Sequence, residues 1–407
     1  MTVSRRTFIQ AGLGMLSVYV TAPHALILGA QAAEFEPRRA GSKVLVVVQM
    51  GGGNDGLNTV IPYGMGQYYS ARPVIGIAQD KVLHLNEQIG FNPNMEGMHG
   101  LFKQGKVALI QGVGYPIANR SHFRSIEIWQ TANPDKIIET GWLGRYLDLA
   151  DSKNLFAAVN VEPALPKTLA SNKCMVPSVG NVFDFKFRTD PQYMADHDVQ
   201  LQTFNSIYQN FELKRPEVEL LRDAGLDANK ASDYLQKIVR GYKSDVKYPG
   251  GNFGNGLKFI AQMLAGGVDA KIFTVNHDGF DTHTNQLGVQ NRLLKTFSDG
   301  ISAFYKDLEQ HNLQDDVVIM AFSEFGRRVA ENNGRGTDHG TAAPVYIIGS
   351  KVKGGIYGDH PSLTDLDEGD LKHGIDFRSV YATLLDKWMN ADSRQVLGQH
   401  FATVEFV

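Results

Sequence analysis

Residues 43–58 of the chain read KVLVVVQMGGGNDGLN, and this stretch is the strongest indicator of the fold class. Its first part, Lys43 to Gln49, is a short run rich in β-branched residues, which predicts a fully buried parallel strand. Its second part places Asn54 and Asp55 in a glycine-rich turn directly after that strand. Because ligands of parallel sheets bind beyond the carboxyl ends of strands, the turn is a candidate site segment.

Similar apolar runs recur along the chain and predict further strands at residues 107–112, 156–161, 271–275, 316–322 and 344–348. Helical patterns lie between them, and the clearest begins near Gln286 with apolar residues three, four or seven positions apart. Strands that alternate with helices predict an α/β fold with three α/β/α layers and a mainly parallel central sheet. The more polar segment at about 191–242 predicts a helical insertion within a single domain that spans residues 34–407.

Composition and charge exclude several classes of protein. The chain has 407 residues, a formal net charge of -3, and ordinary hydrophobic and charged fractions of 43% and 20%. A nucleic-acid-binding protein normally carries a basic face, and no such cluster occurs here, so we expect no nucleic-acid partner. The only cysteine, Cys174, excludes an intrachain disulfide and a cysteine-rich zinc site.

The first 33 residues have the features of an export signal. Arg5 and Arg6 precede a weakly apolar stretch that closes with the small-residue pattern Ala30-Gln31-Ala32. Adjacent arginines before such a stretch indicate the twin-arginine route, with the twin-arginine translocase as the partner during export. Because the stretch is interrupted by proline, histidine and glycines, we expect no stable membrane span after removal of the signal. The predicted location is periplasmic or otherwise exported.

Polar and ionisable residues cluster where the predicted strands end or begin. The segments that carry them are 51–58, 119–123, 276–283, 323–328 and 336–341. Carboxylates and imidazoles from separate strand ends suit a divalent metal such as zinc, manganese or calcium. Such an ion would polarise a phosphoryl or sulfuryl oxygen. Ser121 lies where a helix begins, a position well placed to meet an anion.

Each of these residues also has a purely structural explanation. Ser121 is a good helix N-cap, and Asp55 suits a turn. Asp281 with His283 fits a helix cap beside a surface histidine, and Asp338-His339 fits a loop that bonds its own backbone. The glycines at 51–56 also match a dinucleotide fingerprint, but that motif needs a helix immediately afterwards. The β-rich residues 57–63 argue against it, so a nucleotide-dependent oxidoreductase is the weakest alternative.

Several ordered motifs resemble one known family, the bacterial exported family catalogued as domain of unknown function 1501. These motifs are GGGNDGLNTVIPY at 51–63, NRSHFRSIEIWQTA at 119–132, TGWLGRYLD at 140–148, GFDTHTNQ at 279–286, FSEFGRR at 322–328, GTDHGTAAPVYIIG at 336–349 and DFRSVYATLLDKW at 376–388. That family is itself similar to the alkaline phosphatase and sulfatase superfamily, so the resemblance implies an alkaline phosphatase-like fold.

The resemblance also implies roles for particular residues. Asp55 matches the metal-binding aspartate after the first strand, and Ser121 stands at the nucleophile position. Asp281 (or Asp278), together with His283, resembles the Asp-and-His pair that holds one metal. His339 resembles the last metal histidine.

Two departures from the superfamily pattern occur in the segment Ser323-Glu324-Phe325-Gly326. Glu324 replaces an aspartate, and Phe325 replaces its histidine partner. Asp281 and His283 are also closer in sequence than the superfamily pair. The site predicted from these positions therefore holds one or two ions, or none.

Two functions follow from this reading. The first is an exported metal-dependent hydrolase of phosphate or sulfate esters, whose expected metal ligands are Asp55, Asp281, His283, Glu324 and His339. In it, Ser121 attacks or orients the attacking water, and Arg120 or Arg327 holds the charged group, because a guanidinium matches phosphate or sulfate geometry. The alternative is a non-catalytic phosphatase-like scaffold that binds a periplasmic or cell-envelope partner. The ligand is accordingly a small-molecule ester or a cell-envelope component.

Overall fold

The computed structural model describes residues 37–152, 154–182, 197–209 and 230–407. The chain divides into two compact units, whereas the sequence predicts one domain with a helical insertion. Unit 1 comprises Met1–Arg39, Glu139–Lys243 and Gln262–Ala270. Unit 2 comprises Ala40–Ile138, Ser244–Ala261 and Lys271–Val407, and every predicted site residue belongs to unit 2.

Unit 2 is built on a mixed sheet of mostly parallel strands, in the order β10-β5-β9-β8-β1-β7. The strands are β1 (Val44–Gln49), β5 (Val107–Gly114), β7 (Ile272–Asn276), β8 (Val317–Phe322), β9 (Ala343–Ile348) and β10 (Gly355–Tyr357). β1 runs parallel to both β7 and β8, and β9 runs antiparallel to its neighbours β5 and β8. The α/β prediction is confirmed, and the predicted strands of this unit lie within two residues of their observed ends.

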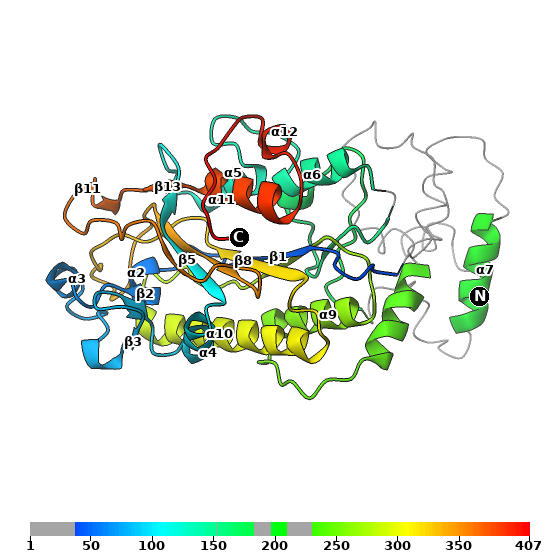
Figure 1. The fold of residues 1–407 in the computed structure, drawn as a ribbon, viewed down its shortest axis with the longest axis horizontal. Helices are drawn as coiled ribbons and strands as arrows, with labels where there is room; N and C mark the ends of the chain where they lie inside the picture. Colours follow the sequence, from blue (N-terminus) through cyan, green and yellow to red (C-terminus); the bar gives the residue numbers. More distant parts are fainter. Residues whose placement is uncertain (1–36, 153, 183–196, 210–229) are drawn as a thin grey trace, which may run out of the picture. The chain divides into compact units, whose positions relative to one another are not determined.

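Helices cover both faces of this sheet, as Figure 1 shows. On one face lie α5 (His122–Thr131) and α11 (Phe377–Thr383), and Trp129 of α5 stacks on Phe322 of β8 at 4.8 Å between ring centroids. On the other face lie α4 (Glu96–Lys103) and α10 (Gln286–Gln310), and Phe297 of α10 packs near Tyr346 of β9. The three-layer prediction therefore holds for unit 2, and α10 begins at the predicted residue.

The remaining elements of unit 2 are short. They include α2 (Gly56–Thr59), β2 (Val60–Ile61), α3 (Gly66–Ala71), β3 (Leu83–His84), β4 (Gly90–Phe91), β11 (Leu366–Asp367), β12 (Asp370–Leu371), β13 (Ile375–Asp376) and α12 (Ser393–Leu397). β11 and β12 pair as a two-stranded antiparallel ribbon. The single turn of α2 occupies a segment that the sequence predicts as β-rich, because the Asp55 carboxylate accepts hydrogen bonds from the backbone N–H groups of Leu57 and Asn58.

Unit 1 contains α6 (Trp142–Ala150), β6 (Ala158–Asn160) and α7 (His197–Gln209). Residues 230–241 are also helical, so the described parts of the predicted insertion at 191–242 are mainly helical. Helix α9 (Asn252–Ala265) begins in unit 2 and ends in unit 1. The predicted export signal at residues 1–33 lies outside the described residues.

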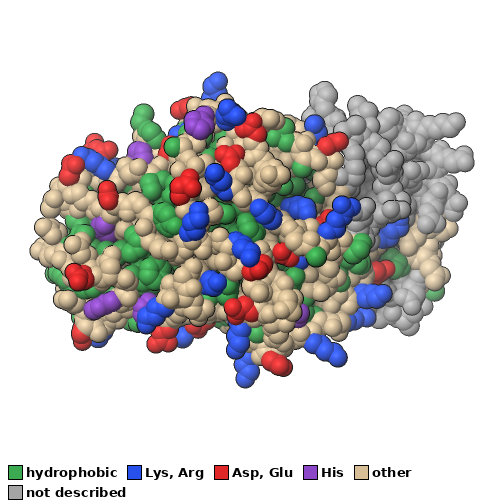
Figure 2. Space-filling model, viewed as in Figure 1, with side chains coloured by type: hydrophobic (Ala, Val, Ile, Leu, Met, Phe, Trp, Pro, Cys, Tyr) green, Lys and Arg blue, Asp and Glu red, His purple; other side chains and the backbone are tan. Residues whose placement is uncertain are grey.

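Two surface properties bear on the partners. Among the described residues, no helix has the length and apolar character needed to cross a membrane. On the face shown in Figure 2, acidic and basic side chains are interspersed over the described part of the chain.

Candidate metal centre

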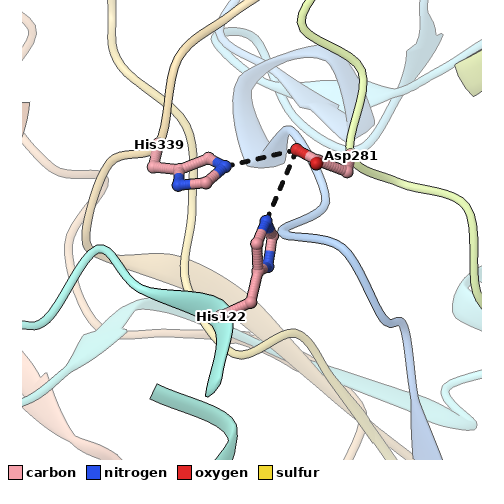
Figure 3. A group of neighbouring side chains, drawn as sticks. All are labelled: His122, Asp281 and His339. Atoms are coloured by element: carbon pink, nitrogen blue, oxygen red, sulfur yellow. Dashed lines mark hydrogen bonds and ion pairs between the residues drawn. The ribbon is translucent and has the colours of Figure 1, made fainter. Parts of the chain in front are cut away.

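Three side chains from distant parts of the sequence converge in unit 2. They are His122, Asp281 and His339, whose potential ligand atoms all lie within 4.8 Å of one another. Figure 3 shows both imidazoles pointing at the Asp281 carboxylate. The Asp281 Oδ1 atom is 3.2 Å from His339 Nε2 and 3.5 Å from His122 Nε2.

Loops at one edge of the sheet bring these residues together. His122 is the first residue of α5, which follows β5. Asp281 lies after β7, in a loop held by hydrogen bonds from the Gly279 and Phe280 N–H groups to the Gly51 carbonyl after β1. His339 lies before β9, in a segment that forms an antiparallel bridge to Arg327 just after β8. The site therefore depends on four loops that only the folded sheet aligns.

The hydrogen bonds of the two imidazoles define which nitrogen faces Asp281. His122 Nδ1 lies 2.8 Å from Glu324 Oε1, and His339 Nδ1 lies 2.7 Å from the Arg120 carbonyl oxygen. Because both partners are acceptors, each Nδ1 carries a hydrogen, so the Nε2 atom that faces Asp281 is the one left to take a proton or a cation. Metal-binding histidines are commonly oriented by such a carboxylate or carbonyl partner.

His283, which is partly exposed, approaches the same carboxylate. Its Nε2 atom lies 3.1 Å from Asp281 Oδ1 and 3.0 Å from His339 Nε2. Its Nδ1 atom lies 3.2 Å from Asp338 Oδ1, and Asn332 donates to the same Asp338 oxygen at 2.9 Å. A third imidazole thus has its Nδ1 hydrogen engaged and its Nε2 atom directed at Asp281.

This arrangement places lone pairs against one another unless a cation or proton lies between them. The buried Nε2 atom of His122 has no hydrogen-bond partner among the described residues, although it faces Asp281. The hydrogen bond to Glu324 raises the pKa of His122, and burial lowers the pKa of His339. Imidazole nitrogens and one carboxylate oxygen are the donors that zinc accepts, so the residues fit a divalent cation.

Asp281 is held as an anion for this role. Its side chain is half-exposed, and the Arg327 guanidinium donates to Oδ1 at 2.8 Å. Partial burial opposes ionisation, but the hydrogen bonds from Arg327 and His339 outweigh it and lower the pKa of Asp281 to about 2. Asp281 therefore carries its charge throughout the neutral range.

Asp55, which the sequence predicts as a metal ligand, lies outside this group and has other partners. Its Oδ2 atom is 2.6 Å from Arg72 Nη1, and both side chains are fully buried. Gln286 also donates to Oδ2, while Oδ1 caps α2. These contacts satisfy both carboxylate oxygens, so the structure gives Asp55 a place in a buried ion pair.

Glu324, also predicted as a ligand, is fully buried one layer behind the centre. Its Oε1 atom accepts from Gly52 N at 2.9 Å as well as from His122. The Phe325 ring fills the position next to it, with its centroid 4.8 Å from the His122 ring and 4.7 Å from the His339 ring. The two side chains orient the imidazoles by a hydrogen bond and by packing.

The two predicted anion-holding arginines are engaged within the protein. Arg327 is buried and donates to the carbonyl oxygens of Gly53 at 2.6 Å and Thr337 at 2.8 Å, besides Asp281. Arg120 is partly exposed and donates from Nε to Asp370 Oδ2 at 2.7 Å. Arg327 thus has little capacity left for a ligand, whereas Arg120 keeps an accessible edge.

Ser121, the predicted nucleophile, occupies the N-cap position of α5, and its side chain is exposed. Its hydroxyl makes no capping hydrogen bond, so the structural explanation for this serine does not apply. The following residue, His122, is the one that reaches Asp281. Sequence alone leaves open which of these two neighbours faces the centre.

The alternative aspartate, Asp278, lies against Gly51 outside the group, and burial together with the charge of Glu324 raises the pKa of Asp278. Asp338, which the sequence does not assign to the site, orients His283. Asp338 directly precedes the candidate ligand His339 in the sequence. That position is a weak indication of a site role, and the role is visible only in the folded loop.

Comparisons with known proteins agree with the motifs. The model of a family described as a protein of unknown function, DUF1501, matches residues 112–401. Curated proteins give no match.

Several solved structures resemble the chain at low identity. One is a protein of the alkaline phosphatase superfamily from Vibrio parahaemolyticus, 10% identical with a TM-score of 0.40, covering 98% of this chain and 76% of that one. A sulfatase from Pseudoalteromonas sp. is 11% identical with a TM-score of 0.39, covering 99% and 75%. An alkaline phosphatase from the Antarctic bacterium TAB5 is 10% identical with a TM-score of 0.35, covering 78% and 94%.

Proposed function

The chain belongs to the DUF1501 family, and we propose that it is an exported, metal-dependent hydrolase-like protein that acts on phosphate or sulfate esters. The observation that carries the proposal is the convergence of the Nε2 atoms of His122, His283 and His339 on Asp281 Oδ1, at 3.5, 3.1 and 3.2 Å respectively. The ester substrate follows from the resemblance of the motifs to phosphatases and sulfatases.

In this proposal, His122, Asp281 and His339 hold a divalent cation, and His283 is the additional ligand. A nitrogen-rich donor set favours zinc, admits manganese, and disfavours calcium, which prefers oxygen. The bound ion would polarise the oxygen of the ester and lower the pKa of a bound hydroxyl or water. Asp55 and Glu324 support the site from behind and are not ligands in this scheme.

Ser121 is the proposed nucleophile because its hydroxyl is exposed, uncapped and adjacent to His122. Its oxygen bonds to phosphorus or sulfur while the bond to the alcohol oxygen breaks, and the hydroxyl proton passes to the departing alcohol. Water then releases the acid and restores the serine. In the simpler version, Ser121 orients a water that attacks directly. Arg120 holds the charged group through its accessible edge, and Arg327 positions Asp281.

The alternative is a non-catalytic scaffold that binds a periplasmic or cell-envelope partner. The internal engagement of Arg327 and Asp55 favours it, because two charged groups expected to serve a reaction instead stabilise the fold. Export by the twin-arginine route is part of both proposals and rests on Arg5, Arg6 and the stretch after them.

The experiment is elemental analysis of protein purified without chelator, followed by a screen of phosphate and sulfate esters. We expect about one equivalent of a transition metal, lost in His339→Ala, and turnover that disappears in Ser121→Ala. The exposed Ser70 provides the control, since Ser70→Ala should leave turnover unchanged. Full turnover by Ser121→Ala would remove this serine from the mechanism. A folded protein that neither holds metal nor turns over esters would favour the scaffold.

A further inference from the structure

A cavity of about 540 Å³ lies in unit 2 beside the metal centre. Cavities of roughly 300–1,000 Å³ are typical of sites for small organic ligands. One wall comes from the segment between β5 and α5, including Tyr115, Ile117 and Arg120. The facing wall comes from the β11–β12 ribbon and the residues after it, including Leu371 and Lys372.

The cavity shares a wall with the metal centre. Glu324 and Phe325 line it, and these residues bond to and pack against His122. Arg120 also lines it, and its carbonyl oxygen accepts the hydrogen bond from His339 Nδ1. A molecule in this cavity would thus contact residues that themselves bond to or pack against the proposed cation ligands. The organic part of an ester bound at the metal centre would extend into this space.

The segment from the end of β5 into the first turn of α5 carries unusually exposed apolar side chains. Among the described residues, the two most exposed large hydrophobic side chains are Ile117 at 99% and Phe123 at 91%. Ile117 lines the cavity, and Phe123 directly follows His122. Two such residues on the one segment that supplies His122 indicate a surface that an apolar group covers.

The backbone of Ile117 supports the same conclusion. Its φ of 54° lies in the left-handed region, which a β-branched residue rarely adopts. Strained residues of this kind concentrate at ligand sites, where they serve the function. The isoleucine is held out into water at a conformational cost, and an apolar ligand group that covers it would recover hydrophobic free energy.

We propose that this cavity binds the apolar alkyl or aryl part of an amphiphilic phosphate or sulfate ester, with Ile117 and Phe123 closing against it. The proposal rests on the proposed function for the position of the charged ester group. The charged side chains of the lining are of mixed sign, since Arg120 and Lys372 lie among Asp367, Glu368 and Glu324. The lining charge therefore does not select a strongly charged tail, and apolar contact decides the substrate class.

Binding of n-alkyl phosphates from ethyl to octyl, measured by titration calorimetry below their micellar concentrations, tests the proposal. Each methylene that enters the cavity should tighten binding about fourfold. Ile117→Ser and Phe123→Ser should each weaken octyl phosphate by about tenfold and leave ethyl phosphate unchanged. Ile137, which is 70% exposed and does not line the cavity, provides the matched control Ile137→Ser.

The outcomes separate this proposal from the proposed function because binding is measured independently of turnover, both with zinc and after chelation. An affinity that rises with alkyl chain length in the wild type, but not in the two variants, supports the cavity proposal even if no ester is hydrolysed. Turnover of ethyl phosphate without any dependence on chain length would overturn the cavity proposal and leave the hydrolase intact. Equal weakening by Ile137→Ser, or binding of several molecules per chain, would mean detergent-like adsorption and also overturn it.

Discussion

The candidate metal centre depends on which nitrogen of each imidazole carries a hydrogen. The Glu324 carboxylate, the Arg120 carbonyl and the Asp338 carboxylate each accept from an Nδ1 atom, so three Nε2 atoms face one carboxylate. Without those acceptors the rings could rotate or change tautomer. At the scale of single residues, the orienting partners therefore matter as much as the ligands.

Glu324→Gln should weaken zinc binding by about 10–100-fold, the usual effect of removing an orienting carboxylate. The amide retains an oxygen for His122 and Gly52 but loses the charge that makes the imidazole basic. Competition with a chromophoric chelator measures the affinity. Glu331→Gln is the control, because Glu331 also bonds backbone N–H groups, at Val74 and Ile75, outside the described metal group. Equal affinities for Glu324→Gln and wild type would contradict an orienting role.

Asp55→Asn should lower the free energy of unfolding by about 3–5 kcal/mol, because it leaves the Arg72 guanidinium buried without its counter-charge. Zinc affinity of the folded protein should stay within about twofold of wild type. Urea unfolding measures the first quantity and chelator competition the second. If affinity collapses while stability is unchanged, Asp55 is a ligand after all, as the resemblance implies.

At the scale of elements, the turn after β1 determines how closely the loops approach. Gly53 has a φ of 72°, and a Cβ atom there would collide with the Phe325 ring. Gly52 has a φ of 113°, and its added Cβ would lie 2.5 Å from the Asp281 backbone nitrogen. These glycines let the loops after β1, β7 and β8 pack together at the centre.

Gly53→Ala should reduce zinc affinity by more than tenfold and destabilise the protein, because displacement of Phe325 moves the two imidazoles that pack on it. Gly105→Ala is a closely matched control, since Gly105 has a φ of 70° but open space around its position. That control isolates the left-handed strain alone, which costs about 1–2 kcal/mol. Similar zinc affinities for the two variants would show that the approach to Phe325 is unimportant.

At the scale of the whole molecule, the proposed ion would cross-link segments around residues 122, 281 and 339 of unit 2. Anything that binds only the folded state stabilises it by mass action. Chelation should therefore lower the melting temperature. At 100-fold excess of zinc over its dissociation constant, the gain is about 2.7 kcal/mol.

Hydrogen exchange should show where that stabilisation acts. Removing zinc should speed exchange of amides near residues 119–124, 279–284 and 336–341, and leave the β1 strand unchanged. Uniform acceleration throughout the chain would indicate global destabilisation rather than a local site. No change in either melting temperature or exchange would argue that the protein does not bind zinc at all.

The sequence by itself determined the α/β class, the main strands of the sheet and the start of α10, because buried strands and helix faces have local periodic signatures. It also pointed to the loops that carry the candidate site, since those loops lie at strand ends or strand entries. Only the tertiary structure decided which of two nearby candidates joins the group of potential ligands. It is His122 and not its neighbour Ser121, and it is Asp281 and not Asp278. It also placed Asp55 against Arg72 and Glu324 behind His122. The reason is physical: orientation in a loop depends on hydrogen bonds to partners hundreds of residues away, and neither composition nor spacing encodes them.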